Sequence, residues 1–464
     1  MITAIKNTVK TDSASAIFDK TFVLSVFLFF NFMITFRVLL ISLIPEAELI
    51  MEAIYELIIF IYLGYRLVHR AQSGNLRFNS LEIYLVLIFF LPFLASYAAM
   101  LEFGQPIWYG IGTFRDFYLI FGGLIVYNML RNNTVSIELV ERMFVLTAWA
   151  NVLLFYFMTL FTNPAQYQDT GLAGANTAKG GDVYYRFNMA FVFFGTIYYF
   201  TKAFFRKKPH LMLYGLIFFV YVVFFRFDRT SIAVLVAALV ALYATALAPR
   251  RQMIWLLGAI TPLSAVIILV YFANPGIYSK YYLMFADAFS TLGGSLNAEG
   301  EESVRLSELR IAYEYIEKNP WIGNGKVSPR WVEGGYNYFL GYFYQSDIGF
   351  VGQIFMYGFL GAALLYFQFA LAINYILRIK HIKRNVFLVT LKFFLLALAL
   401  DTITTGYLTI YAAQSMTPLI LIYFFYQKDR ILQVKIQAEN AAVEKSKSHL
   451  THRNAGITSA PSAQ

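Results

Sequence analysis

The sequence predicts an all-α protein that crosses a membrane many times. Two observations exclude a soluble fold: 59% of the 464 residues are hydrophobic, and only 14% are charged. Soluble domains carry about 25% charged residues, so this composition could not cover a water-exposed surface. A third observation is that the apolar residues gather in runs of about 20, the length of a helix that spans a bilayer.

Twelve apolar runs are long enough to span the membrane. The first is too long for a signal-peptide core, so we expect it to be retained as a helix. The runs lie near residues 18–44, 47–66, 81–101, 113–130, 140–162, 184–203, 211–227, 230–248, 253–272, 347–377, 385–405 and 408–426.

The basic residues predict the orientation of these helices. The net charge of +10 comes from Lys and Arg in short segments between apolar runs, which favours a role in topology over nucleic-acid binding. All basic clusters fall on the cytoplasmic side if both termini are cytoplasmic. The clusters are Arg66/Arg70/Arg77, Arg206/Lys207/Lys208, Arg250/Arg251, Arg378/Lys380/Lys383/Arg384 and the tail from Lys428.

The resulting organisation has five parts. Residues 1–17 form a cytoplasmic N-terminus, 18–272 contain nine spans, 273–346 form a large outer loop, 347–426 contain three spans, and 427–464 form a cytoplasmic tail. The tail is polar and rich in small residues from about Gln437, which predicts disorder there. The loop contains SVRLSELRIAYEYIEKNP, whose apolar spacing predicts an amphipathic helix that Ser303 can cap and Asn319-Pro320 ends.

Ionisable side chains within the spans are candidates for function because charges are costly inside a bilayer. In the predicted topology nearly all of them lie in the outer half, under the large loop, and only Lys392 lies in the inner half. The outer set is Arg37, Glu52, Glu56, Arg115, Asp116, Arg186, Arg226, Asp228, Arg229 and Asp401. Arginine binds phosphate well because its planar fork donates two hydrogen bonds. This predicts a site for a lipid diphosphate, although each charge alone could also pair or reach the headgroups.

Four features around the large loop resemble the O-antigen polymerase/ligase superfamily of bacterial membrane glycosyltransferases. They are DRTSIAVLVAALVALY from Asp228; Arg305 followed by Pro320, Gly323 and Gly325 in a PxxGxG turn; SDIGFVGQIFMYGFLGAALL with Asp347, Gly349 and Gly352; and the twelve-helix layout with one large outer loop. The resemblance covers about residues 180–370. It implies a GT-C-like bundle in the bacterial inner membrane, with the loop in the periplasm.

The resemblance also implies polymerisation of undecaprenyl-diphosphate-linked repeat units of O-antigen, capsule or exopolysaccharide. Ligases of the superfamily carry a histidine where this chain has Tyr338, and all five histidines here fall on the cytoplasmic side, which favours a polymerase. A ligase-like transferase with another acceptor is the first alternative, and a transporter or flippase of lipid-linked sugars is the second. A chain-length regulator is a partner by resemblance only.

The candidate site residues follow from this hypothesis. We expect Arg229 and Arg305 to hold the diphosphate with support from Arg186 and Arg226, in an inverting transfer without cofactor or metal. Asp347, Glu308 and Asp228 are the candidate bases, Asp347 first, although Asp347 could equally cap the next helix. Tyrosines stack on sugars but also form interfacial belts, so Tyr336, Tyr338 and Tyr342 are either glycan contacts or belt residues.

Overall fold

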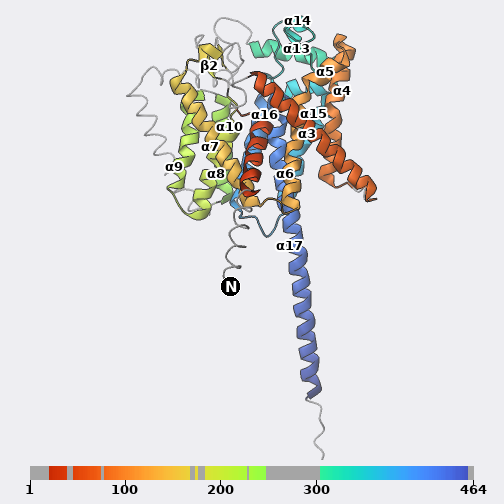
Figure 1. The fold of residues 1–464 in the computed structure, drawn as a ribbon, viewed down its shortest axis with the longest axis vertical. Helices are drawn as coiled ribbons and strands as arrows, with labels where there is room; N and C mark the ends of the chain where they lie inside the picture. Colours follow the sequence, from red (N-terminus) through yellow and green to blue (C-terminus); the bar gives the residue numbers. More distant parts are fainter. Residues whose placement is uncertain are drawn as a thin grey trace, which may run out of the picture.

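The computed structural model describes residues 20–38, 45–74, 78–167, 173–175, 183–185, 187–226, 229–246 and 304–457. The described chain is a bundle of helices (Figure 1). One very long helix, α17 (Tyr407–Ile457), projects from one end of the bundle. Two short helices, α13 (Val304–Lys318) and α14 (Tyr336–Leu340), cover the opposite end.

The bundle itself is formed by the remaining elements. They are the helix Lys20–Thr35, α3 (Pro45–Gln72), α4 (Ser80–Phe103), α5 (Ile107–Thr113), the 3-10 helix η1 (Arg115–Phe121), α6 (Gly122–Arg131), α7 (Ile137–Phe161), η2 (Pro164–Tyr167), α8 (Ala190–Arg206), α9 (Leu211–Val220), the π-helical turn η4 (Tyr221–Arg226), α10 (Arg229–Ala246), α15 (Gly349–Arg378) and α16 (Val386–Thr404). Two three-residue strands, β1 (Ala173–Ala175) and β2 (Val183–Tyr185), form an antiparallel ribbon that the sequence analysis did not predict.

Local sequence signals account for several helix ends. Asn79 accepts a hydrogen bond from the Glu82 amide while the Glu82 side chain accepts one from the Asn79 amide, so α4 begins with a capping box. Ser136 and Asn385 cap α7 and α16 in the same way, without the reciprocal contact. These polar caps mark where apolar runs begin, which is why the run boundaries in the sequence are close to the helix boundaries.

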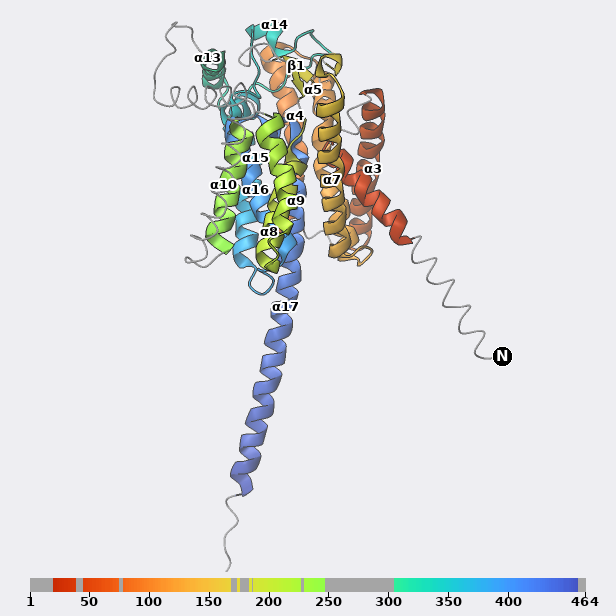
Figure 2. The ribbon, with the colours of Figure 1, turned by 90° about the vertical axis from the view of Figure 1, so that its left-hand side faces the viewer.

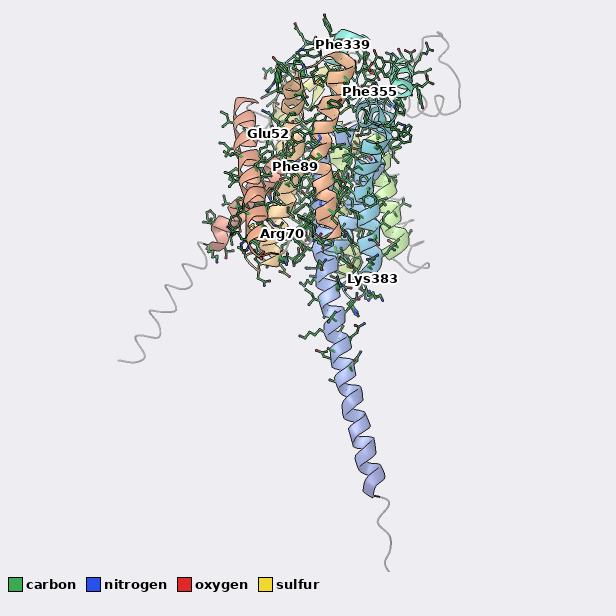
Figure 3. The ribbon with its side chains drawn as sticks, turned by 90° about the vertical axis from the view of Figure 1, so that its right-hand side faces the viewer. Glu52, Arg70, Phe89, Phe339, Phe355 and Lys383 are labelled. Atoms are coloured by element: carbon green, nitrogen blue, oxygen red, sulfur yellow. The ribbon has the colours of Figure 1, made fainter. Side chains whose placement is uncertain are left out.

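The predicted helical fold is confirmed, and its apolar helices are compatible with a membrane protein. Four helices are long and apolar enough to cross a bilayer, Ser80–Phe103, Ile137–Phe161, Gly349–Arg378 and Val386–Ile403. Three shorter apolar helices accompany them, Lys20–Thr35, Leu211–Phe225 and Thr230–Thr245. The predicted run 253–272 lies outside the described residues. Figure 3 shows Arg70 and Lys383, from two predicted cytoplasmic clusters, at the end from which α17 projects, and Glu52 nearer the opposite end.

Two segments of the chain have a local structure that differs from the prediction. The run 113–130 is divided into the end of α5, η1 and α6. The segment packs closely at Gly122 and Gly123, where an added Cβ would lie 2.6 Å from Thr35 Oγ1 and 3.2 Å from Thr417 Cα. The predicted disorder after Gln437 also differs, because α17 continues to Ile457. That segment is rich in Ala, Glu, Lys and Gln, which favour helix even without burial.

The central core is aromatic. The Phe144 ring on α7 is fully buried and contacts rings from three other helices. Its partners are Phe32 and Phe36 at the end of the first helix, Phe191 and Phe194 on α8, and Phe387 on α16. This cluster joins the first described helix to the rest of the bundle, and it lies directly beside Arg37.

The loop after α13 is inserted into a break in α15. At Gly358 the backbone of α15 leaves helical geometry, with φ of 64° and ψ of −179°. A break at membrane depth leaves backbone groups without partners, and each is costly unless the protein satisfies it. Here the loop does so: the amides of Asn324 and Gly325 donate to the carbonyls of Phe355 and Met356, at 2.8 and 2.9 Å.

The same loop also accepts hydrogen bonds from the far side of the break. The Phe359 amide donates to the Pro320 carbonyl at 2.8 Å, and the Leu360 amide donates to Trp321. Gly323 and Gly325 both have positive φ, and an added Cβ on Gly325 would lie 2.0 Å from the Ala95 carbonyl oxygen on α4. The PxxGxG segment is therefore a clip between α4 and α15, and it fixes the position of the next residue, Lys326.

Candidate functional site: a ring of four charges beside Lys326

The first helix ends in a turn that holds Arg37 in a strained conformation. The Arg37 amide donates to Ile34 O and the Val38 amide donates to Met33 O, the two hydrogen bonds of a Schellman motif. Arg37 occupies the left-handed position of that motif, with φ of 49°, where glycine is usual. A side chain there costs about 1 kcal/mol. Backbone strain of this kind clusters at functional sites, which makes Arg37 a candidate for a functional residue.

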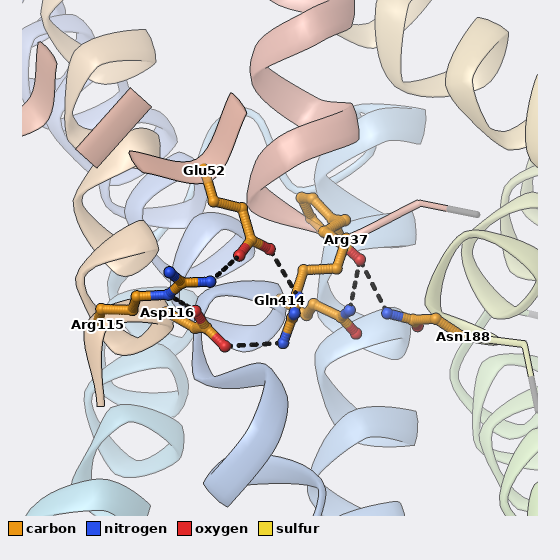
Figure 4. Close-up of polar contacts among 7 residues, drawn as sticks. Arg37, Glu52, Arg115, Asp116, Asn188 and Gln414 are labelled. Carbon is orange, nitrogen blue, oxygen red and sulfur yellow. Dashed lines mark hydrogen bonds and ion pairs between the residues drawn. The ribbon is translucent and has the colours of Figure 1, made fainter. Parts of the chain in front are cut away.

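Two side-chain amides hold this turn in place. Gln414 Nε2 on α17 and Asn188 Nδ2 before α8 both donate to the Phe36 carbonyl oxygen, at 2.7 and 2.8 Å (Figure 4). Gln414 itself is fully buried. The peptide preceding Arg37 is therefore fixed from two sides, so the direction in which the Arg37 side chain leaves the backbone is fixed as well.

Four charged side chains form a closed ring around this point (Figure 4). Arg37 Nε lies 3.0 Å from Glu52 Oε1, and Arg37 Nη1 lies 2.9 Å from Asp116 Oδ2. Arg115 closes the ring, with Nη2 at 3.4 Å from Glu52 Oε2 and Nε at 3.2 Å from Asp116 Oδ1. Positive and negative groups alternate, so each guanidinium group is oriented by two carboxylates.

Burial differs around the ring in a useful way. The Glu52 side chain is 1% exposed, whereas those of Arg37, Arg115 and Asp116 are between 23% and 27% exposed. Glu52 on α3 is therefore the buried member of the ring, and the two arginines and Asp116 form its accessible side. Fixed guanidinium groups at an accessible surface can bind an anion without first reorganising.

A lysine adds a fifth charge. Lys326 lines a small polar cavity of about 70 Å³ together with Arg37, Thr113, Phe114, Asp116, Phe117 and Ala412. The Gln105 side chain is fully buried and holds the backbone directly after Lys326, on both sides of Val327: Nε2 donates to Lys326 O at 3.1 Å, and Oε1 accepts from the Ser328 amide at 2.6 Å. The Lys326 ammonium group lies 5.6 Å from the centre of the Phe114 ring.

The charges around the cavity do not cancel through contact. Among the described residues, no carboxylate forms an ion pair with Lys326, although the charge of Asp116 acts on it through space. Burial lowers the pKa of Lys326, the charge of Asp116 raises it, and that of Arg37 lowers it further. Three cations and two anions give the set a net charge of +1, or zero when the buried neighbour Glu56 is ionised. Lys326 is nevertheless the cation of this set that no described carboxylate contacts, so an anion in the cavity would meet Lys326.

Three of the predicted site residues come together in a second cluster, over the end covered by α13. Glu308 on α13 is fully buried, and its Oε1 accepts a hydrogen bond from the Tyr344 amide at 3.0 Å. Its Oε2 is buried without a hydrogen-bond partner. Burial raises the pKa of Glu308; the Tyr344 amide lowers it, the charge of Asp347 raises it, and that of Arg305 lowers it.

The exposures within this cluster separate the candidate bases. Glu308 is inaccessible, so it positions the segment around Tyr344 and cannot touch a substrate. Asp347 is exposed and accepts a hydrogen bond from Ser346 Oγ at 3.2 Å. It does not cap α15, whose N-cap is Ile348 without a side-chain hydrogen bond, so the capping alternative was wrong. Arg305 is also exposed.

The other predicted residues have varied places. Arg226 ends η4 and Arg229 begins α10, as the motif predicted, and the structure describes their backbone only. Arg186 and Asp228 lie outside the described residues. The expected glycan contact Tyr336 is buried, and its hydroxyl donates to Gly325 O, so it has no face for a sugar. Tyr338 and Tyr342 are 70% and 62% exposed.

The sequence analysis therefore identified part of the site. Arg37, Glu52, Arg115 and Asp116 belong to the outer charged set that predicts a diphosphate site, but they are not among the named site residues, because no spacing in the sequence shows that they meet. The sequence analysis did not single out Lys326. The available signal was the position of that lysine, directly after the PxxGxG turn. Within the described part of the chain, no group of three or more acidic or histidine side chains is placed to hold a metal ion.

Comparison with known proteins does not assign the chain to a family. No protein-family model matches the chain. No curated protein matches it at a significant level.

Proposed function

We propose that this protein is a membrane glycosyltransferase that polymerises undecaprenyl-diphosphate-linked oligosaccharide units at the outer face of a bacterial inner membrane. One observation carries the proposal: the clip places Lys326, which has no ion-pair partner among the described residues, at a polar cavity beside Arg37 and Arg115. This arrangement favours an anion at the end of the bundle that α13 covers. The motifs around residues 180–370 resemble those of the O-antigen polymerase/ligase superfamily and suggest the glycan.

The chemistry would be a single displacement. An acceptor hydroxyl attacks the anomeric carbon, the new glycosidic C–O bond forms, and the bond from that carbon to the diphosphate oxygen breaks. The electron pair leaves with the diphosphate, whose charge Lys326, Arg37 and Arg115 stabilise. Oriented cations at a developing negative charge lower the barrier by about 3–4 kcal/mol for each strong donor. The acceptor proton goes to a carboxylate, for which exposed Asp347 is the candidate.

The second cluster supports the same proposal. Asp347 and Arg305 are exposed on the covering end of the bundle, and buried Glu308 fixes the chain between them through Tyr344. Tyr338 and Tyr342 are exposed on the same segment and are suited to stack on sugar rings. Under this proposal the twelve predicted spans form a GT-C-like bundle, with both termini in the cytoplasm and the catalytic face in the periplasm.

A gel of the glycan products tests the proposal. A deletion strain is complemented with the wild type, Lys326→Ala or the control Lys318→Ala, at matched membrane levels. Lys318 lies on α13 at the same end of the bundle, over the Tyr315 ring and away from the polar cavity, so it controls for loss of a lysine. We expect single repeat units in the deletion and in Lys326→Ala, and a ladder with the wild type and the control. Long unattached lipid-linked chains in the deletion would instead show a ligase, and a wild-type ladder with Lys326→Ala would refute the site.

A further inference from the structure

A second cavity adjoins the charged ring. It has a volume of about 270 Å³ and is lined by residues from the end of the first helix and from α7. Figure 2 shows the first helix, in red, passing beside α7. The lining of the cavity is apolar except for one threonine: Met33, Val38, Thr147, Ala150, Leu153, Leu154 and Phe157. Ala150 is the small residue in the middle, which leaves the hollow between larger side chains.

The cavity is elongated along the bundle. Its α7 residues recur from Thr147 to Phe157 on one face of the helix, a length of about 15 Å at 1.5 Å per residue. That is about half the thickness of the bilayer core. Leu153 and Phe157 are 56% and 55% exposed, so the cavity opens sideways, toward the lipid. It therefore has the length and the lateral opening of a groove for a hydrocarbon chain within one leaflet.

The polar and apolar cavities share one turn of the backbone. Val38 lines the apolar groove, while the adjacent Arg37 lines the polar cavity. The Phe36 carbonyl oxygen at this junction accepts hydrogen bonds from Gln414 and Asn188, so this group is already satisfied by the protein. A molecule with an anionic head at Lys326 and Arg37 would have its tail directed past Val38 into the groove.

We propose that this groove holds the first isoprenoid units of the lipid-diphosphate donor, so that one ligand occupies both cavities. This inference rests on the proposed function and specifies where its substrate binds. It assigns Ala150, Leu153 and Phe157 to recognition of the lipid chain, in addition to the charged groups that bind the diphosphate. The groove binds the chain before transfer and retains it on the leaving group.

Binding to the purified protein in detergent tests the groove separately from catalysis. The probe is undecaprenyl diphosphate, measured by native mass spectrometry, for the wild type, Ala150→Phe and the control Leu146→Phe. Leu146 lies on α7 and is 50% exposed but does not line the groove. We expect Ala150→Phe to weaken binding at least tenfold and Leu146→Phe to leave it unchanged. Inorganic pyrophosphate should bind weakly and equally to all three.

Three outcomes would overturn the groove: equal binding by Ala150→Phe, equal binding of phosphatidylglycerol, or an unchanged ladder in cells that express Ala150→Phe. The last of these would leave the proposed function intact. Conversely, if the protein binds the probe in the groove but makes no polymer, the groove is supported and the proposed function is refuted. If Ala150→Phe does not fold, a photoreactive isoprenoid diphosphate on the wild type decides: crosslinks to Met33, Leu153 or Phe157 support the groove, and crosslinks confined to residues that do not line it overturn it.

Discussion

Replacing Lys326 with methionine should separate function from stability. Lys326 is half-buried, has no ion-pair partner among the described residues, and is held by Gln105 through its backbone, which methionine would preserve. Methionine has similar length and removes a charge that burial disfavours. We therefore expect the free energy of unfolding to be unchanged or to rise by about 1 kcal/mol.

Activity should move in the opposite direction. If Lys326 stabilises the leaving diphosphate, its removal should cost about 3–4 kcal/mol of transition-state stabilisation, a loss of about 10²–10³-fold in the rate of polymerisation. The assay is chain extension by purified protein with a lipid-linked repeat unit, alongside thermal unfolding of the same sample. If the variant lost stability and activity together, Lys326 would have a structural role. A variant with wild-type activity would refute the reasoning.

Three further predictions concern the same two clusters. Because burial lowers the pKa of Lys326, its positive charge is present at low pH and is lost as the pH rises through that lowered pKa. Activity should therefore decline at a pH below the usual range of lysine pKa values. Lys326→Arg should move this decline to higher pH in a pH–rate profile. Glu308→Gln should keep the hydrogen bond from the Tyr344 amide and retain activity, whereas Glu308→Ala should lose about 1–3 kcal/mol of stability in thermal unfolding. A loss of about 10²-fold in the activity of Glu308→Gln would instead show that Glu308 acts as a base. Gly325→Ala should reduce both stability and activity because its Cβ would clash with α4, while Gly341→Ala, also at positive φ but with open space around it, should cost only about 1 kcal/mol and serves as the matched control.

Much of the fold could be predicted because its signals are local. Apolar runs and polar caps such as Asn79 are contiguous in the sequence, and the amphipathic pattern of α13 gave a helix that ends at Lys318, directly before Asn319-Pro320. The division of the run 113–130 could not be predicted from its local apolar pattern, which gives no sign that Gly122 and Gly123 pack against helices far away in the sequence.

The site was harder to predict for the same reason. Arg37 and Asp116 are separated by 79 residues and Glu52 lies on a third element, so their ring exists only after the helices pack. Arginine also disfavours the left-handed conformation of Arg37, so no propensity indicated that turn. The position of Lys326 results from the insertion of its loop into the break of α15 at Gly358. The PxxGxG motif predicts the turn, but it does not predict which helix the turn contacts.

Incubation of purified protein with an undecaprenyl-diphosphate-linked repeat unit, followed by separation of the products by length, tests the central claim most directly. The account predicts products of several repeat units with the wild type and with Lys318→Ala, and none above the input with Lys326→Met. No extension by the folded wild type with its own organism's repeat unit, or equal extension by Lys326→Met, would contradict it.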